Sequence, residues 1–202
     1  MASTLVFATR NRGKLSELRA LVKPLGLEVV SAADLGAPDV EEDGLTFEAN
    51  AAKKALEVSA AVGQPSLADD SGLVVEALRG APGVRSARFA GPDADDRANN
   101  ERLLELLRDV PTERRQAHFV CVMAFADPHG TLGEHVELTR GRCNGLIAEA
   151  PQGAGGFGYD PLFWVPERGQ TFAELPADVK NTISHRAMAM RLMQSFLKRY
   201  FH

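Results

Sequence analysis

The chain has little of several features that mark particular classes of protein. It holds two cysteines in 202 residues, Cys121 and Cys143, which are too few and too isolated for a disulfide framework. No apolar run approaches the roughly 20 residues needed to cross a bilayer, and the first residues lack the basic flank and apolar stretch of a signal peptide. We therefore expect reduced thiols, no membrane partner and a cytoplasmic location.

Positive charge is also scarce. The formal net charge is −4 at pH 7, from 23 Lys and Arg against 27 Asp and Glu. Nonspecific binding to a nucleic-acid backbone needs clustered Lys and Arg, so we expect no nucleic-acid partner. Any phosphate chemistry should instead be local and assisted by a metal ion.

Several familiar catalytic motifs are missing as well. No His-Glu-x-x-His, Cys-x-x-Cys or Gly-x-Ser-x-Gly pattern occurs, so zinc hydrolysis and a nucleophile elbow have no motif support. The composition that remains, 45% hydrophobic and 25% charged, is typical of an ordinary globular protein. Residues 1–202 are enough for a single domain, or for one domain with a small lobe.

The hydrophobic pattern predicts strands that alternate with helices in the first half of the chain. Apolar runs predict strands over 4–8 and 27–30, and helical spacing predicts helices over 14–22 and 47–62. Thr46 is a plausible N-cap of the second helix and Gly63 a plausible stop. A short strand over 73–75 should follow an acidic turn.

The second half predicts a hairpin. A helix is expected over 98–107, strands over 117–126 and 135–142 with a tight turn over 127–130, and a last helix from about 185 to 200. We therefore expect an α/β fold with a mixed central β-sheet flanked by helices.

The most informative segment is Asp69-Asp70-Ser71-Gly72, which follows a short apolar approach. Two adjacent carboxylates with a hydroxyl and a glycine suit a divalent metal ion and an activated water, because hard oxygen ligands hold Mg²⁺ while leaving it partly hydrated. The alternative is an ordinary polar turn, since the same residues supply turn geometry.

A second candidate is the loop Thr9-Arg10-Asn11-Arg12-Gly13-Lys14, which joins a predicted strand to a predicted helix. Backbone N–H groups and the helix dipole favour an anion there. It is not a Walker A loop, because Ala8 stands where that motif needs glycine and Leu15 where it needs Ser or Thr. The alternative is a solvated basic loop.

The acidic cluster Glu41-Glu42-Asp43-Gly44 precedes the helix that carries Asn50 and Lys54. Asn50 and Lys54 are four residues apart and project from one side of the helix. A carboxylate from this cluster could join Asp69 and Asp70 around one metal ion, with Lys54 neutralising phosphate oxygens. A solvated turn is the alternative, and the choice between Glu41 and Glu42 stays open.

The third unusual element is the glycine-rich loop 153–161, in which Phe157 and Tyr159 alternate with glycines. Glycine lets the backbone approach a ligand and an aromatic ring offers a face for a nucleobase. The alternative is a mobile loop whose aromatics fill the core. Lys180 and Ser184-His185-Arg186 precede and open the last helix, where cations oppose the helix dipole, which favours a ligand-binding role for Arg186.

Together these motifs resemble the family of non-canonical purine nucleoside triphosphate pyrophosphatases, the inosine triphosphate pyrophosphatases. The match spans four ordered motifs: residues 9–14, 42–54, 68–72 and 155–161, with Ser184-His185-Arg186 near the end. The family's first loop usually has a glycine where Arg10 stands.

The resemblance implies a two-lobed fold with the active site in the cleft between lobes, and a single pyrophosphatase domain over 1–202. It implies Mg²⁺-dependent hydrolysis of ITP, dITP or XTP to the monophosphate and pyrophosphate, with one ion per site and Mn²⁺ as a substitute. Asp70 would be the general base and a metal ligand, with Glu42 as a further ligand and Asp69 in support. The residues implied to bind substrate are Thr9, Arg10, Asn11, Arg12, Gly13, Lys14, Lys54, Ser71, Phe157, Gly158, Tyr159, Asp160, Lys180, His185 and Arg186.

In this scheme Phe157 stacks on the purine, and His185 and Arg186 donate hydrogen bonds to its 6-keto group. The resemblance also implies a homodimer and a role in keeping deaminated purines out of DNA and RNA. Two alternatives remain at this stage. One is a pyrophosphatase for modified pyrimidine or methylated nucleotides, as in the septum-formation inhibitor family, and the other is a non-catalytic nucleotide sensor.

Overall fold

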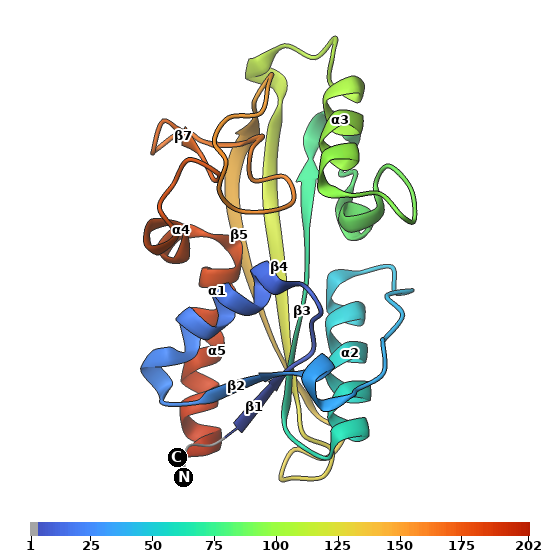
Figure 1. Cartoon of the computed structure of the whole chain (residues 1–202), viewed down its shortest axis with the longest axis vertical. Helices are drawn as coiled ribbons and strands as arrows, with labels where there is room; N and C mark the ends of the chain where they lie inside the picture. The colour runs from blue at the N-terminus through green and yellow to red at the C-terminus, as the bar shows by residue number, and fades with distance from the viewer. Residues whose placement is uncertain (1–3) are drawn as a thin grey trace. The chain divides into compact units, whose positions relative to one another are not determined.

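The computed structural model describes residues 4–202, which form a mixed sheet with flanking helices (Figure 1). In these residues the sheet has seven strands, in the order β2-β1-β3-β4-β5-β6-β7. Strand β1 pairs in parallel with β2 and β3, whereas β6 pairs antiparallel with β5 and β7, so the predicted mixed sheet is confirmed. The elements are β1 (Thr4–Phe7), α1 (Arg12–Val22), β2 (Glu28–Ser31), α2 (Phe47–Val62), β3 (Ser66–Val75), α3 (Asp96–Leu106), β4 (Gln116–Ala126), β5 (Val136–Ile147), β6 (Phe163–Val165), β7 (Gln170–Thr171), α4 (Ala177–Ile183) and α5 (His185–Phe201).

The chain divides into two compact units. The first contains the residues up to Asp70 together with Cys121–Gly141 and Arg186–His202, and the second contains Ser71–Val120 and Arg142–His185. The predicted single domain over 1–202 and the predicted cleft between lobes stay predictions. Among the helices of residues 4–202, none combines the length and the apolar character needed to span a bilayer.

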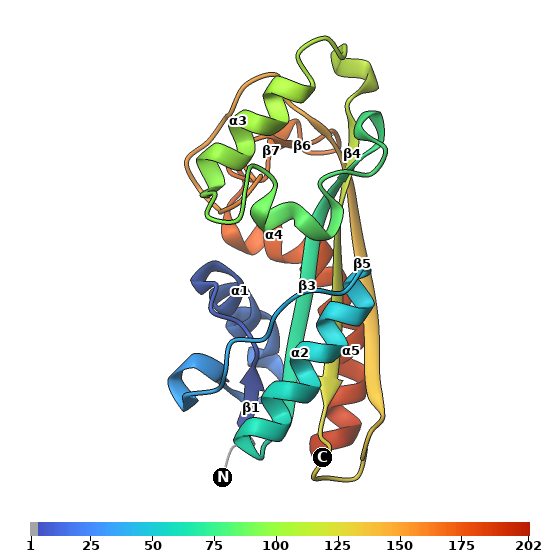
Figure 2. The same ribbon diagram turned by 90° about the vertical axis from the view of Figure 1, so that its right-hand side faces the viewer.

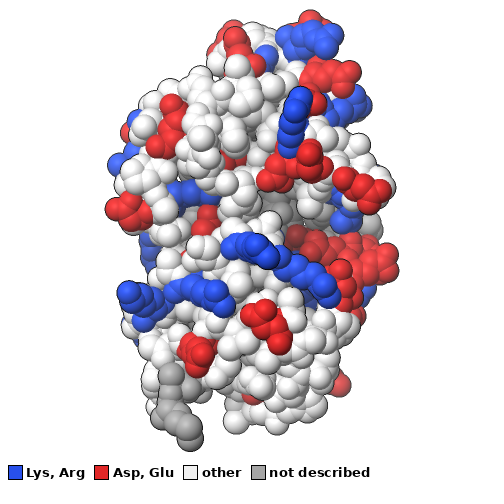
Figure 3. Space-filling view, in the orientation of Figure 1, with Lys and Arg blue, Asp and Glu red and all other residues white. Residues whose placement is uncertain are grey.

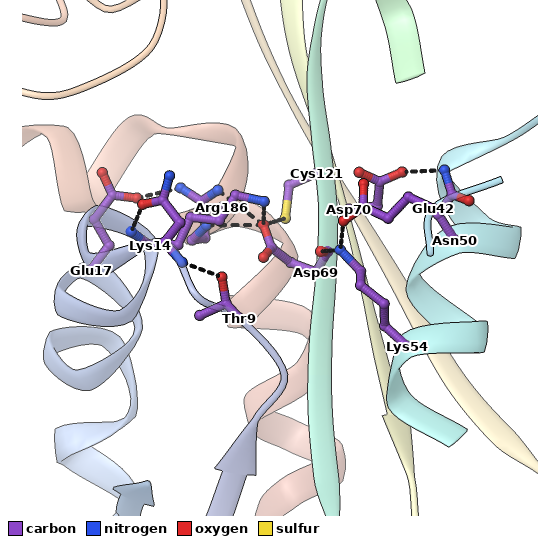
Figure 4. Close-up of polar contacts among 11 residues, drawn as sticks. Thr9, Lys14, Glu17, Glu42, Asn50, Lys54, Asp69, Asp70, Cys121 and Arg186 are labelled. Carbon is purple, nitrogen blue, oxygen red and sulfur yellow. Dashed lines mark hydrogen bonds and ion pairs between the residues drawn. The ribbon is translucent and has the colours of Figure 1, made fainter. Parts of the chain in front are cut away.

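In the first unit, alternate residues of the central strands face different helices. Leu5, Phe7 and Leu67 are fully buried in one core with residues of α1 and α5, and Phe7 is level with Leu67 in the register of β1 and β3. Helix α2 covers the other face of the sheet (Figures 1 and 4). Because side chains of a strand alternate between faces, odd-numbered positions of β3 before residue 70 point toward α1 and α5, and even-numbered positions point toward α2.

The second unit has its own apolar core. Leu73 and Val75 of β3 pack with Leu103 and Leu107 at the end of α3. Around them, Phe119, Phe163 and Phe172 form an aromatic group with ring centroids 4.6 to 5.9 Å apart. Tyr159 and Leu162 belong to this core, which therefore supports the loop between β5 and β6 that carries Phe157.

Three predictions of local structure were wrong or incomplete. Asp69-Asp70-Ser71-Gly72 does not form a turn but lies inside β3, because apolar residues flank it on both sides and each carboxylate finds buried partners. Strand β5 extends to Ile147, well past the predicted end. The short elements β6, β7 and α4 were not predicted, since two to seven residues carry too little periodicity to be recognised.

Helix α2 follows its predicted bounds, and both of its predicted caps are confirmed. The Thr46 hydroxyl accepts a hydrogen bond from Ala49 N at 3.1 Å, and Gly63 takes a left-handed conformation and donates to Ser59 O. Glycine is favoured at such a position because it has no Cβ to clash.

We predict that Thr46→Ala lowers the free energy of unfolding by about 1 kcal/mol, because it leaves an orphan N–H at the start of α2. Thr46→Ser keeps the accepting hydroxyl and should retain nearly all of that stability. Urea unfolding followed by circular dichroism checks the pair, and equal losses in both variants would contradict the capping role.

Candidate active site

The two adjacent carboxylates of β3 point to opposite faces of the sheet (Figure 4). Asp69 and Asp70 are 0% and 3% exposed, so both charges are removed from water. Asp69 lies on the side of α1 and α5, and Asp70 lies on the side of α2. The two side chains therefore have different partners, and the predicted metal site that they share stays a prediction.

Asp69 is held by cations from two helices. Its Oδ2 accepts from Arg186 Nη2 at 2.9 Å and Nε at 3.3 Å, and it lies 3.2 Å from Lys14 Nζ. Arg186 also donates to Glu17 of α1 and is 1% exposed. Burial opposes the charge of Arg186, but the carboxylates of Asp69 and Glu17 hold the pKa of that guanidinium above its usual value.

The loop between β1 and α1 ends in a capped helix. The Asn11 side chain accepts from Lys14 N at 3.0 Å, and Thr9 Oγ1 accepts from Asn11 N at 3.2 Å. The predicted strand, loop and helix are confirmed, and Lys14 is directed to Asp69. Of the exposed arginines, Arg10 lies 3.2 Å from Asp39, and Figure 3 shows basic side chains near the start of α1 beside acidic ones over the segment before α2.

On the other face, Asn50 and Lys54 of α2 both approach the acidic residues, as their spacing predicts. Asn50 Nδ2 donates to Asp70 Oδ2 at 2.9 Å. Lys54 Nζ donates to Glu42 Oε1 at 2.7 Å and to Asp69 O at 2.5 Å. The half-buried Glu42, and not the exposed Glu41, is therefore the carboxylate beside Lys54.

Gly44 fixes the orientation of Asn50. Its N–H donates to Asn50 Oδ1 at 2.7 Å, and a Cβ at this position would come within 2.5 Å of the same oxygen. With the oxygen held by Gly44, the Asn50 amide nitrogen is left to face Asp70. The glycine that ends the acidic cluster thus allows the close approach that orients the site.

The carboxyl group of Asp70 has a strongly shifted pKa. Burial raises the pKa of Asp70 to about 6, and the charge of Glu42 adds to the rise, while Lys54 and Asn50 oppose it. The pKa of Lys54 is raised, because the charges of Asp69, Glu42 and Asp70 outweigh the burial that would lower it. A carboxylate with a pKa near 6 can accept a proton at neutral pH.

The donors around Asp70 are compatible with a magnesium ion. Among residues 4–202 no group of three or more His, Cys, Asp or Glu is arranged to hold a metal ion by itself. Mg²⁺ normally needs fewer protein ligands, because it keeps several waters and uses one or two carboxylates together with substrate phosphates. A divalent cation would offset the repulsion between the negative charges of Glu42 and Asp70.

The remaining predicted residues lie in the second unit. Lys180 Nζ lies 2.5 Å from Asp160 Oδ2 and 4.8 Å from the centroid of the Phe157 ring. The His185 ring stacks on Phe119 at 4.6 Å and is 5% exposed. The Tyr159 hydroxyl donates to Ser86 O at 2.8 Å, so this aromatic belongs to the core, as the alternative interpretation of the loop proposed for its rings.

The sequence did not single out several residues that organise these contacts. Glu17 lies on α1, where the helical spacing was the only sequence signal for it. Its partner Arg186 is 169 residues away. Asn100 of α3 donates to Gly158 O at 2.9 Å, and Asp96 accepts from Gly158 N at 2.7 Å. Their spacing of four residues on one helix was the available signal. Arg186 donates to the carboxylates of Asp69 and Glu17, and its predicted donation to a purine stays a prediction.

Sequence comparison places this arrangement in a known family. The model of the Ham1 family matches residues 5–196, a range that contains every predicted site residue from Thr9 to Arg186. The chain belongs to the Ham1 family. The resemblance found from the motifs is thereby confirmed.

Individual relatives of this Ham1 chain match it over nearly its whole length. A dITP/XTP pyrophosphatase from Desulforamulus reducens is 53% identical over 200 residues, covering 98% of each protein. The solved Ham1 protein of Staphylococcus aureus is 39% identical with a TM-score of 0.84, covering 98% of this chain and 100% of that one. A HAM1 protein from Coxiella burnetii is 38% identical with a TM-score of 0.87, covering 98% and 99%.

We predict that Asp70→Asn stabilises the metal-free Ham1 protein at pH 7. A pKa of about 6 against an ordinary value of 3.8 corresponds to at most about 3 kcal/mol of destabilisation by the ionised form. Because the pKa is raised in the folded state, the wild type becomes less stable relative to the variant as the pH rises from about 4 through 6. Thermal unfolding in EDTA should show the variant more stable at pH 7 and the two proteins alike near pH 4. A wild type as stable as the variant at pH 7 would contradict the strained carboxylate.

We predict the opposite for Asp69. Asp69→Ala removes one of the two carboxylates to which the buried Arg186 donates. Breaking one side of a buried ion pair costs on the order of 3 kcal/mol. Urea unfolding measures the loss. Glu101→Ala on α3 removes the exposed Arg97–Glu101 pair and is the control, with a midpoint close to that of the wild type. Equal midpoints for the two variants would exclude a structural role for Asp69.

Proposed function

We propose that this Ham1-family enzyme hydrolyses dITP, XTP and ITP to the monophosphate and pyrophosphate in a Mg²⁺-dependent reaction. The observation that carries the proposal is the cluster of Asp70, Glu42, Lys54 and Asn50, which joins a carboxylate of raised pKa to a second carboxylate and a buried ammonium. The printed names of the relatives, dITP/XTP pyrophosphatases, supply the substrate class.

Each residue of the cluster has a separate role in this proposal. Asp70 accepts the proton of the attacking water, because its pKa of about 6 lies close to the working pH. Asn50 keeps the carboxylate oriented. Lys54 and Lys14 offset the charge that develops on phosphate oxygens, each from a position fixed by a contact with Asp69.

Glu42 and Asp70 are the residues that would hold Mg²⁺. The bound ion would supply positive charge to the phosphates and favour ionisation of water. Asp69 is outside this set, because its side chain is directed to Arg186 and Lys14 on the other face of β3. Its role is to position these cations.

Base selection is assigned to the second unit. Phe157 offers a ring for stacking on the purine, and His185 offers a donor for the 6-keto oxygen that distinguishes hypoxanthine and xanthine from adenine. A donor that meets the amino group of adenine leaves a polar group unpaired, at a cost of about 1 to 3 kcal/mol. The cellular role would be removal of deaminated purines from the nucleotide pool. A cytoplasmic location, expected from the sequence, and a homodimer, implied by the family resemblance, stay predictions.

The test is release of pyrophosphate and orthophosphate from dITP, XTP, ITP, ATP and GTP, with and without Mg²⁺. We expect pyrophosphate, metal dependence and a strong preference for the first three substrates. Orthophosphate as the product would move cleavage to the terminal phosphate, and equal rates on all five would remove the base-selection role of His185.

Asp70→Asn separates catalysis from binding. We expect turnover to fall by about 10²-fold or more, because removal of a general base has effects of that size, while the affinity for dITP in Mg²⁺ stays within a few-fold. Isothermal titration calorimetry measures the affinity. Unchanged turnover would exclude Asp70 as the base.

A further inference from the structure

In the second unit, two side chains of α3 bind both the N–H and the C=O of one residue of the glycine-rich loop. Gly158 N donates to Asp96 Oδ2 at 2.7 Å, and Gly158 O accepts from Asn100 Nδ2 at 2.9 Å. The same Asn100 nitrogen donates to Asp96 O at 2.8 Å, which keeps the amide facing the loop. Figure 2 shows α3 beside the loops that follow β5. Two side chains one helical turn apart thus form a clamp on Gly158.

The clamp acts next to Phe157. Gly158 has a φ of +60°, a left-handed conformation that glycine adopts readily because it has no Cβ. On the N-terminal side of Gly158, Phe157 N donates to Asp160 Oδ2 at 2.9 Å. Lys180 Nζ lies 4.8 Å from the centroid of the Phe157 ring. The peptide groups before and after Phe157 are therefore both anchored, which fixes the point of the backbone from which the ring projects.

We propose that Asp96 and Asn100 are positioning residues that hold Phe157 in the orientation needed to stack on the nucleobase. This inference rests on the proposed function, because it gives α3 a part in binding the purine of the substrate. Neither residue touches the reacting atoms. They act through Gly158, so their effect falls on substrate affinity and not on the chemical step.

The location of Asp96 argues against a purely structural role. The N-cap of α3 is the preceding residue, Asp95, whose side chain accepts from Ala98 N at 2.7 Å. Asp96 is exposed and its carboxylate accepts from Gly158 N, so this side chain adds little to the apolar core. Asn100 is 9% exposed, and among residues 4–202 its Oδ1 has no hydrogen-bond partner. Its amide nitrogen donates both to Gly158 O and to Asp96 O, so this side chain links α3 to the loop.

The test compares Asp96→Ala, Asp96→Asn and Asp95→Ala in the full chain. We expect Asp96→Ala to raise KM for dITP about fivefold or more, as loss of a charge-assisted hydrogen bond predicts, with kcat nearly unchanged. Asp96→Asn keeps an accepting oxygen and should restore most of the affinity. Asp95→Ala weakens the start of α3 but leaves the clamp, so its KM should match that of the wild type.

Inorganic tripolyphosphate, which has no base, provides a second readout as a competitive inhibitor. Its inhibition constant should be the same in the wild type and in Asp96→Ala, because the clamp serves only the base. Asn100→Ala should raise KM as well, and the double variant should lose less than the two single losses combined, since both residues hold Gly158.

Amide hydrogen exchange over residues 157–159 measures the clamp without substrate, and we expect faster exchange in Asp96→Ala. An unchanged KM in Asp96→Ala with an active wild type would overturn the positioning role, as would an equal rise in Asp95→Ala. A wild type that hydrolyses none of the purine triphosphates would instead overturn the proposed function and the base-binding role together, whatever the exchange rates.

Discussion

The alternation of side chains along β3 is the constraint on which the rest of the site depends. Two adjacent carboxylates on a regular strand must face opposite ways, so Asp69 meets Arg186 and Lys14 while Asp70 meets Asn50. The main chain between them links the two faces, because the carbonyl of Asp69 accepts from Lys54. One aspartate is thereby neutralised by cations and serves to place them. The other is the carboxylate that accepts a proton in the proposed reaction.

The two faces treat charge differently, and the difference follows from the partners. Asp69 has two cations within hydrogen-bond or ion-pair distance, so its negative charge is compensated where it is buried. Asp70 shares its surroundings with Glu42, and burial with this second carboxylate raises its pKa to about 6. Such an arrangement costs stability in the absence of a cation, which is a common property of functional sites. The proposed magnesium ion and the substrate phosphates would meet this unbalanced charge.

The second unit solves a different physical problem, which is to hold an aromatic ring on a glycine-rich loop. Glycine permits the tight path of residues 155–158 but has no side chain with which to anchor that path. One anchor is Asp160 of the same loop, which is paired with Lys180 of α4, and the others are Asp96 and Asn100 of α3. In the proposed function, a ring held in this way needs less ordering when a base binds.

Local features of this protein were determined by the sequence itself. Helix α2 with its caps at Thr46 and Gly63, the capped loop from Thr9 to Lys14 and the same-side projection of Asn50 and Lys54 all depend on hydrogen bonds and periodicity between near neighbours. The motifs were also sufficient to recognise the family. The sequence did not reveal that the acidic run lies within a strand, because an Asp-Asp-Ser-Gly segment is ordinarily a turn and only its buried partners make a strand tolerable. Nor did it reveal the pairing of Asp69 with Arg186, 117 residues later, or the clamp on Gly158 from α3. Contacts of this kind were decided by the tertiary structure, because they depend on which faces of distant elements the fold brings together.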